Sequence, residues 1–337
     1  MRWLEWVRRL PSGISGLVRD REDGRHLAAL RIGVSVVLLG SLFEMLRTGT
    51  VEAIWMRPGD GGIFRTTPYL WTWKTILPDP KPATVYGLVH ATCALAVAVA
   101  AGIGGRVAVL LLLLAYYSLR SLNPPSTGGY DALLVNALIF MLLAPVTRTW
   151  SVDCWLKNRK WSSEESVPSW PRYVFVFQLV ILYFATGLKK ASVIWSPAGG
   201  YSALYYIMMD VTWVRFDSLE FLRDQVFLTR MGTAVTWHWE HLAPILLFAA
   251  YFRRTRDEPG RIRRWFNRYD MRIPYVLVGF GVHAGIAVVT AVGPFSAVTL
   301  ALYPSLFGPK ELDDYAQRVR ETWSRLRSRR SSDGGRS

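Results

Sequence analysis

The sequence YFATGLKK, residues 183–190, decides the fold because it ends an apolar run on two adjacent charges. The run begins near Tyr173, and its length and composition are those of a membrane helix. Two ammonium groups therefore stand where such a helix reaches its interface. Charges at this position either extend to water as anchors or serve a functional site.

Composition extends this interpretation to the whole chain. The 337 residues are 51% hydrophobic yet carry a formal net charge of +15, which is unusual for a soluble protein. Several apolar runs approach the length that crosses a bilayer, and many of the 15 Trp residues lie beside them, as in interfacial belts. The basic residues gather in loops and tails, which fits anionic lipid headgroups better than a duplex. We therefore expect membrane lipid as a partner and no nucleic acid.

The fold class predicted from this pattern is an all-α integral membrane protein, a polytopic helical bundle of about eight transmembrane helices. The predicted spans are about 26–46, 84–103, 105–122, 131–147, 173–190, 239–253, 274–291 and 293–308. In the first span, Arg31 and Glu44 are too far apart to pair on one helix, so we expect each to face the bundle interior. Residues 191–238 predict surface-lying or re-entrant helices.

Two basic segments flank the predicted transmembrane domain of residues 26–308. Residues 1–25 carry apolar residues at helical spacing among arginines, which predicts an amphipathic helix on the inner leaflet. Residues 309–337 form a basic tail. With both termini in the cytoplasm, eight crossings also place the Arg/Lys-rich segments 148–172 and 253–272 inside, as the positive-inside rule requires. The predicted location is the plasma (inner) membrane, crossed several times.

This orientation puts Lys189 and Lys190 at the outer face. There they oppose the positive-inside bias, which indicates that a local interaction holds them in place. A lysine in a low-dielectric pocket beside a second cation loses its proton readily and can act as a base at neutral pH. Alternatively, both lysines are snorkelling anchors at a helix end. The residues alone leave both roles open.

The run WHWEH, residues 237–241, puts His238 and His241 on one helical face. Two imidazoles at this spacing can ligate a metal, but no third ligand is evident nearby, so we predict no metal site. We expect instead that Glu240 and a histidine make polar contacts at the outer end of the sixth span. His283 lies inside an apolar run, where a histidine is expected to form hydrogen bonds between helices.

Several segments together resemble the HTTM (horizontally transferred transmembrane domain) family of vitamin K-dependent gamma-carboxylase-like membrane proteins. Residues 183–190, followed by Trp195 and Gly200, are similar to the family's Tyr-Phe-x-x-Gly-x-x-Lys...Trp...Gly signature. Less specific similarities extend over nearly the whole chain, at Arg31 and residues 59–61, 150–153, 237–240, 283, 294–295 and 303–304.

The resemblance implies an all-helical membrane fold and, if the chain is an enzyme, a carboxylase- or oxygenase-like lyase chemistry. In the animal carboxylase, the second lysine of the matching pair is thought to deprotonate reduced vitamin K. Oxygen then yields a strong base that removes a proton from a substrate glutamate, and carbon dioxide adds. By this resemblance Lys190 is the candidate base, Lys189 favours loss of its proton, and Glu240 and His283 complete the catalytic candidates.

The cofactor that the resemblance implies is reduced menaquinone or a vitamin K-like quinone. Tyr183, Trp195, Tyr130 and Asp131 are the candidate cofactor-binding residues. Asp131 is also expected to cap the N-terminus of the fourth span. The region in which the carboxylase has a functional histidine aligns with residues 129–131, where this chain has none.

Two functional hypotheses of different classes follow. The first is an HTTM-type membrane protein whose outward-facing cavity takes a quinone-like lipid or a peptide, with Lys190 as the candidate base. The second is a non-catalytic membrane factor for maturation or export of a secreted peptide. Small-solute transport is less favoured because the sequence shows no internal inverted repeat.

Overall fold

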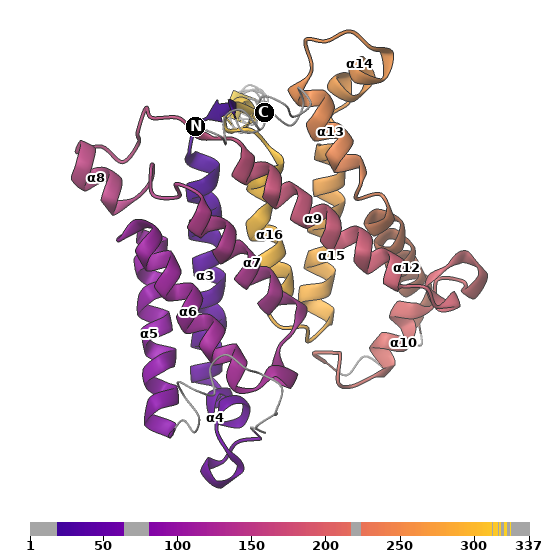
Figure 1. The fold of residues 1–337 in the computed structure, drawn as a ribbon. Helices are drawn as coiled ribbons and strands as arrows, with labels where there is room; N and C mark the ends of the chain where they lie inside the picture. Colours follow the sequence, from indigo (N-terminus) through magenta and orange to yellow (C-terminus); the bar gives the residue numbers. More distant parts are fainter. Residues whose placement is uncertain are drawn as a thin grey trace, which may run out of the picture.

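The structure is a computed structural model that describes residues 19–63, 81–216 and 224–311, together with 313–315, 317, 320, 321 and 324. Residues 1–18 of the segment predicted to be an amphipathic helix over 1–25, and most of the predicted tail, 309–337, lie outside the described residues. Residues Arg21–Glu22 form a strand, so a helix does not extend through that part of the segment. The regular structure is almost entirely helical (Figure 1).

The helices are α3 (Arg25–Arg47), α4 (Thr50–Trp55), α5 (Pro82–Ala101), α6 (Gly105–Leu122), α7 (Gly129–Leu143), α8 (Val152–Asn158), α9 (Trp170–Lys189), α10 (Ala203–Met209), α12 (Val226–His241), α13 (Ile245–Arg254), α14 (Arg261–Arg268), α15 (Arg272–Val289) and α16 (Phe295–Leu302). Shorter 3-10 turns are η1 (Pro58–Asp60), η2 (Pro124–Ser126), η3 (Val193–Trp195), η4 (Pro197–Gly199) and η5 (Tyr303–Leu306). Strands β1 (Arg21–Glu22) and β2 (Val167–Pro168) form a short antiparallel pair.

Five of these helices, α3, α5, α6, α9 and α15, are long and apolar enough to cross a membrane. Two shorter apolar segments, Gly129–Leu143 and Phe295–Leu306, occupy the predicted fourth and eighth spans. The outer faces of the long helices expose large apolar side chains, such as Val107, Ile181 and Leu277. Such surfaces suit hydrocarbon rather than water. The prediction of a multi-pass all-α membrane protein is therefore confirmed, while the count of eight spans is not.

The sixth predicted span, about 239–253, does not form as one helix. Helix α12 starts at Val226, inside the segment expected to form surface-lying or re-entrant helices, and ends at His241. Helix α13 begins at Ile245 after a turn that contains Pro244. Proline lacks an N–H and restricts the residue before it, so the helical ladder is interrupted at this point. The interruption separates the polar end of α12 from the apolar helix α13.

Helix α3 occupies the centre of the first half of the bundle, with α5, α7 and α16 packed around it (Figure 1). Its apolar residues Leu30, Val34 and Leu38 are completely buried, because neighbouring helices cover this face throughout. Arg31 is also fully buried, as predicted for a charge facing the interior. Glu44 is not: it pairs with Arg47 at the exposed end of the same helix, so that part of the prediction is wrong.

The described parts of the segments predicted to be cytoplasmic meet at one end of the bundle, where α3 begins (Figure 1). Strand β1 pairs with β2, which joins the N-terminal segment to the loop before α9. Glu311 accepts from Arg253 at 2.6 Å and from Arg272 at 2.8 Å, which joins the C-terminal segment to α13 and α15. Burial alone raises the pKa of Glu311, but the hydrogen bonds and charge of Arg272 outweigh it and hold this pKa at about 2.

The buried Arg31 side chain contacts both the turn between α5 and α6 and the segment before α8, and it holds the two together. Its Nη2 donates to Trp150 O at 2.5 Å. Gly102 lies directly against this guanidinium, has a φ of +72°, and accepts a hydrogen bond from Asp153 N at 3.1 Å. A Cβ atom at Gly102 would stand 1.7 Å from Arg31 Nη1. Only glycine meets both the backbone conformation and the space at this position.

Gly102→Ala is therefore expected to lower the free energy of unfolding by about 3 kcal/mol, since left-handed strain and overpacking add. Gly104→Ala is the matched control, because Gly104 has a φ of +77° but its nearest neighbour to a new Cβ is Ala108 Cβ at 3.3 Å. The control should lose only about 1 kcal/mol, from the backbone strain. Thermal unfolding in detergent measures both, and equal losses would contradict the role given to Arg31.

Candidate functional site

A cavity of about 990 Å³ opens at the end of the bundle opposite the β1–β2 pair. Its wall is mostly apolar and aromatic, with polar groups at a few places. The lining residues come from α4, the α6–α7 connection, α7, α9, η3, α10, α12, α15, the α15–α16 connection and α16. A large apolar cavity with a small number of convergent polar groups is the usual form of a small-molecule site.

The principal polar group in this wall is an ion pair between Lys190, just past the end of α9, and Glu240 on α12. Lys190 Nζ lies 2.5 Å from Glu240 Oε1, and the two side chains are 17% and 8% exposed. The close approach depends on Gly187, because a Cβ there would lie 3.2 Å from Glu240 Cβ and 3.1 Å from His241 Nδ1. The small residue thus lets α9 and α12 converge where their charges meet.

Two further features complete this charged part of the wall. Lys190 Nζ stands over the ring of Trp195, 4.6 Å from its centroid, which adds a cation–π interaction. Glu240 Oε2 is buried and has no hydrogen-bond partner among the residues that the structure describes. A buried carboxylate oxygen without a partner is costly, so the position favours a donor supplied by a ligand or by water.

A second polar group lies deeper, around Tyr183 of α9. Tyr183 Oη is 2.9 Å from His283 Nε2 and 3.0 Å from Tyr303 Oη, and all three residues are buried. His283 Nδ1 is 3.3 Å from Ser296 Oγ, so both ring nitrogens have partners. His283 therefore makes the interhelical hydrogen bonds expected of it, linking α15 to α9 and α16. The ring of Trp239 packs on Tyr183 with centroids 4.2 Å apart.

Six of the eight candidate residues named from the sequence line this one cavity: Lys190, Glu240, His283, Tyr183, Trp195 and Tyr130. Lys189 is exposed and does not line it, so the charge that contacts the Lys190 ammonium is the Glu240 carboxylate. Asp131 is buried outside the lining. It accepts from Gly128 N at 2.6 Å and from Tyr116 Oη at 2.5 Å, and it thereby caps α7 as predicted.

Trp213 lines the cavity but was not identified from the sequence. It reaches the wall because Val214 forms a β-bridge with Thr290, and Ala291 N donates to Trp213 O at 2.8 Å. This pairing joins segments more than seventy residues apart, and the local pattern of apolar residues does not predict it. The abundance of tryptophan near apolar runs was the one available signal.

The two histidines weighed as metal ligands have other partners. His238 Nε2 is 2.9 Å from Tyr201 Oη, and His241 Nδ1 is 2.7 Å from Trp237 O. Glu240 pairs with Lys190 rather than with either histidine, which differs from the contact predicted for it. Among the described residues, no group of three or more His, Cys, Asp or Glu side chains could hold a metal ion.

Comparison with known proteins identifies one family. The family model for the HTTM domain matches residues 20–256, which is most of the chain and includes α3 to α13. No curated protein and no solved structure matches the chain significantly.

The ion pair makes a testable contribution to stability. Glu240→Leu should cost about 3 kcal/mol, because it leaves the Lys190 ammonium without its partner in a mostly apolar wall. The double variant Lys190→Met/Glu240→Leu should recover much of that loss. Equilibrium unfolding of the three proteins in detergent measures the coupling.

The exposed pair Glu44–Arg47, with side chains 57% and 62% exposed, is the matched control. Glu44→Leu should cost much less than Glu240→Leu, because solvent screens an exposed ion pair. Additive losses from Lys190→Met and Glu240→Leu would show that the two side chains do not interact.

Proposed function

Because this chain belongs to the HTTM domain family of membrane proteins, we propose that its cavity binds a lipid-soluble, quinone-like ligand beside Lys190 and Glu240. The proposal relates the chain to the membrane part of the vitamin K-dependent gamma-carboxylase. Lys190 is the proposed base, Glu240 its proton partner, and Tyr183, His283, Trp195 and Tyr130 line the site.

The observation that carries this proposal is the ion pair at the wall of a large, mostly apolar cavity. A quinone or quinol has a flat ring with two oxygens and a long apolar tail. The aromatic side chains Trp195, Trp213 and Trp239 suit the ring, and the mostly apolar wall suits the start of the tail. A quinol hydroxyl is also the kind of donor that the partnerless Glu240 Oε2 can accept.

The pair can exchange a proton without changing its total charge. Transfer from the Lys190 ammonium to the Glu240 carboxylate leaves a neutral amine and a neutral acid, and low polarity around them favours the neutral form. The amine is then free to accept a proton from a ligand hydroxyl and become an ammonium again. When bound, a reduced quinone supplies the electrons for reaction with oxygen, while the residues of this chain hold and move the proton.

A second candidate function is a non-catalytic membrane factor that assists maturation or export of a secreted peptide. The volume of about 990 Å³ also accommodates a short peptide segment, whose backbone N–H groups can donate to Glu240. In this function Lys190 and Glu240 recognise the peptide and no proton is transferred.

A menaquinol titration of the purified protein, followed by quenching of tryptophan fluorescence, tests the first candidate. We expect saturable binding that weakens at least about tenfold in Lys190→Ala, because a charge-assisted hydrogen bond is worth about 1.5–3 kcal/mol. Lys189→Ala is the matched control, since Lys189 is exposed and does not line the cavity, and it should bind as the wild type does.

Absence of saturable quinol binding by the wild type would rule out the quinone site and favour the peptide. Equal weakening by both lysine variants would indicate a general effect of charge at this face rather than a site at Lys190.

We further propose that the protein lies in the plasma (inner) membrane with both termini in the cytoplasm. Three basic segments support this orientation, since 148–172, 253–272 and the C-terminal segment lie at the end of the bundle that carries β1. The positive-inside rule places such an end in the cytoplasm. The cavity with Lys190 then opens on the outer side.

Labelling with a membrane-impermeant thiol reagent in intact cells tests the orientation. Arg264→Cys on α14 should resist the reagent until the cells are opened, and Asp60→Cys at the opposite end should react at once; both positions are exposed. Cys93 is half-buried and Cys154 is buried, so the unsubstituted protein serves as the background. The reverse pattern of labelling would invert the proposed topology.

A further inference from the structure

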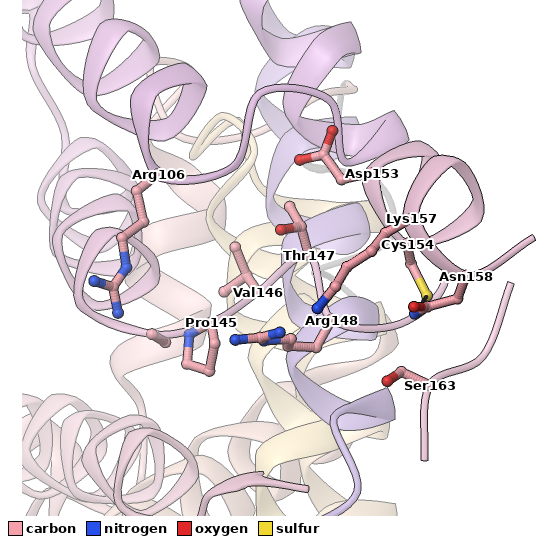
Figure 2. Close-up of a pocket in the computed structure, with 11 residues that line it drawn as sticks. Arg106, Pro145, Val146, Thr147, Arg148, Asp153, Cys154, Lys157, Asn158 and Ser163 are labelled. Carbon is pink, nitrogen blue, oxygen red and sulfur yellow. Dashed lines mark hydrogen bonds between the residues drawn. The ribbon is translucent and has the colours of Figure 1, made fainter. Parts of the chain in front are cut away.

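A second pocket, of about 340 Å³, lies at the basic end of the bundle, away from the Lys190 cavity. Figure 2 shows the side chains that line it, from the start of α6, the α7–α8 connection, α8 and the loop after α8. Arg106, Arg148 and Lys157 contribute three cations, whereas Asp153 is the one carboxylate in the lining. Thr147, Asn158 and Ser163 add neutral groups that can donate hydrogen bonds.

The three cations are incompletely neutralised. Arg148 and Lys157 share a single carboxylate, that of Glu165, with Lys157 Nζ 3.3 Å from Glu165 Oε1. Arg106 donates to Leu143 O at 3.2 Å and has no carboxylate partner within the described part of the chain. Asp153 Oδ1 is used to accept from Gly104 N at 3.2 Å. In Figure 2, Lys157 extends toward Arg148, whose guanidinium points toward Pro145, with Arg106 beyond that proline.

The pocket stands at the level where the bilayer meets water. Arg106 is the second residue of the membrane-spanning helix α6, so it lies at the end of a span. Helix α8 and its flanks expose Trp150, Trp155 and Trp161. Exposed tryptophans beside the end of a span are typical of the headgroup region. A ligand in this pocket is therefore within reach of the lipid headgroups.

We propose that this pocket binds the phosphate group of an anionic membrane lipid. A phosphodiester carries a negative charge and acceptor oxygens, which match two guanidinium groups, an ammonium and nearby hydroxyls. Basic pockets between membrane helices bind phosphate headgroups in this way. The acyl chains would lie along the exposed apolar face of α6, where Val107, Leu110 and Leu111 are exposed. This inference does not depend on the ligand of the Lys190 cavity.

Glu165 competes for the same cations. Its side chain is 53% exposed, on the loop after α8, and it occupies the position between Arg148 and Lys157 that a phosphate would use. Binding therefore exchanges one anion for another at these two residues, while Arg106 gains a charged partner. Removal of the Glu165 charge should accordingly strengthen lipid binding, an effect that damage to the fold would not produce.

The test measures retention of phosphatidylglycerol against phosphatidylcholine by the full chain in mixed nanodiscs, followed by mass spectrometry of the intact complexes. The wild type should prefer phosphatidylglycerol. Arg106→Gln should weaken that preference roughly fivefold, since a cation near the membrane surface is worth about 1 kcal/mol. Arg264→Gln removes an exposed cation of α14 at the same end and should change it little.

The complementary pair of variants is Glu165→Gln and Glu164→Gln. Both remove one negative charge from the same exposed loop, but only Glu165 contacts the cations of the pocket. Glu165→Gln should raise phosphatidylglycerol retention roughly fivefold, and Glu164→Gln should have little effect.

Three results would overturn the proposal. One is a wild type without preference between the two lipids. Another is an equal response within either pair of variants, which would mean that surface charge acts without a site. The third is saturation by inorganic phosphate as strong as that by phosphatidylglycerol, which would make a soluble phosphate the ligand instead of a lipid. Weak competition by phosphate at high concentration agrees with recognition of the headgroup.

Discussion

A bilayer offers no partner for a charge, and this constraint orders both ends of α9 and the start of α15. Lys190 at the end of α9 pairs with Glu240 on α12, and Arg172 at the start of α9 pairs with Glu22 beside α3. Arg272 at the start of α15 binds Asp270 and Glu311. The side chains in these pairs are mostly buried and, Asp270 aside, come from distant parts of the chain. The neutralised charges thereby tie the spans to one another.

The two ends of the bundle use this constraint differently. At the end that carries β1, several ion pairs join the N-terminal segment, the loop before α9 and the segment after α16. At the other end, one ion pair between described residues, Lys190–Glu240, lies in the wall of a cavity of about 990 Å³. The first arrangement suits a rigid support at a charged membrane surface. The second leaves a mostly apolar space with a proton donor and acceptor in contact.

The pairing of Lys190 with Glu240 also bears on the proposed role of Lys190 as a base. Lys190 could lose its proton because of the neighbouring Lys189 cation, or it could pass its proton to Glu240. In both cases it presents a neutral amine to a ligand. They differ in the total charge of the site, which is positive in the first case and zero in the second. A neutral site can be placed in an apolar wall at lower cost. Lys189, which is exposed, is left to the interface, where its charge meets water or headgroups.

The sequence by itself determined the five long apolar helices, because an apolar run and the glycines or prolines that end it are local signals. Residues 105–122 were predicted and found without a shift, and the capping role of Asp131 followed from its place before the fourth apolar run. The pairing of Glu44 with Arg47 and the interruption at Pro244 are also local features of the sequence, but they were not predicted.

The candidate site residues came from a motif rather than from geometry. Only the tertiary structure decided which of them share a wall: Lys190 and Glu240 are fifty residues apart, and they meet because Gly187 lets α9 approach α12. Periodicity records which face of a helix is apolar, but not which helix covers that face.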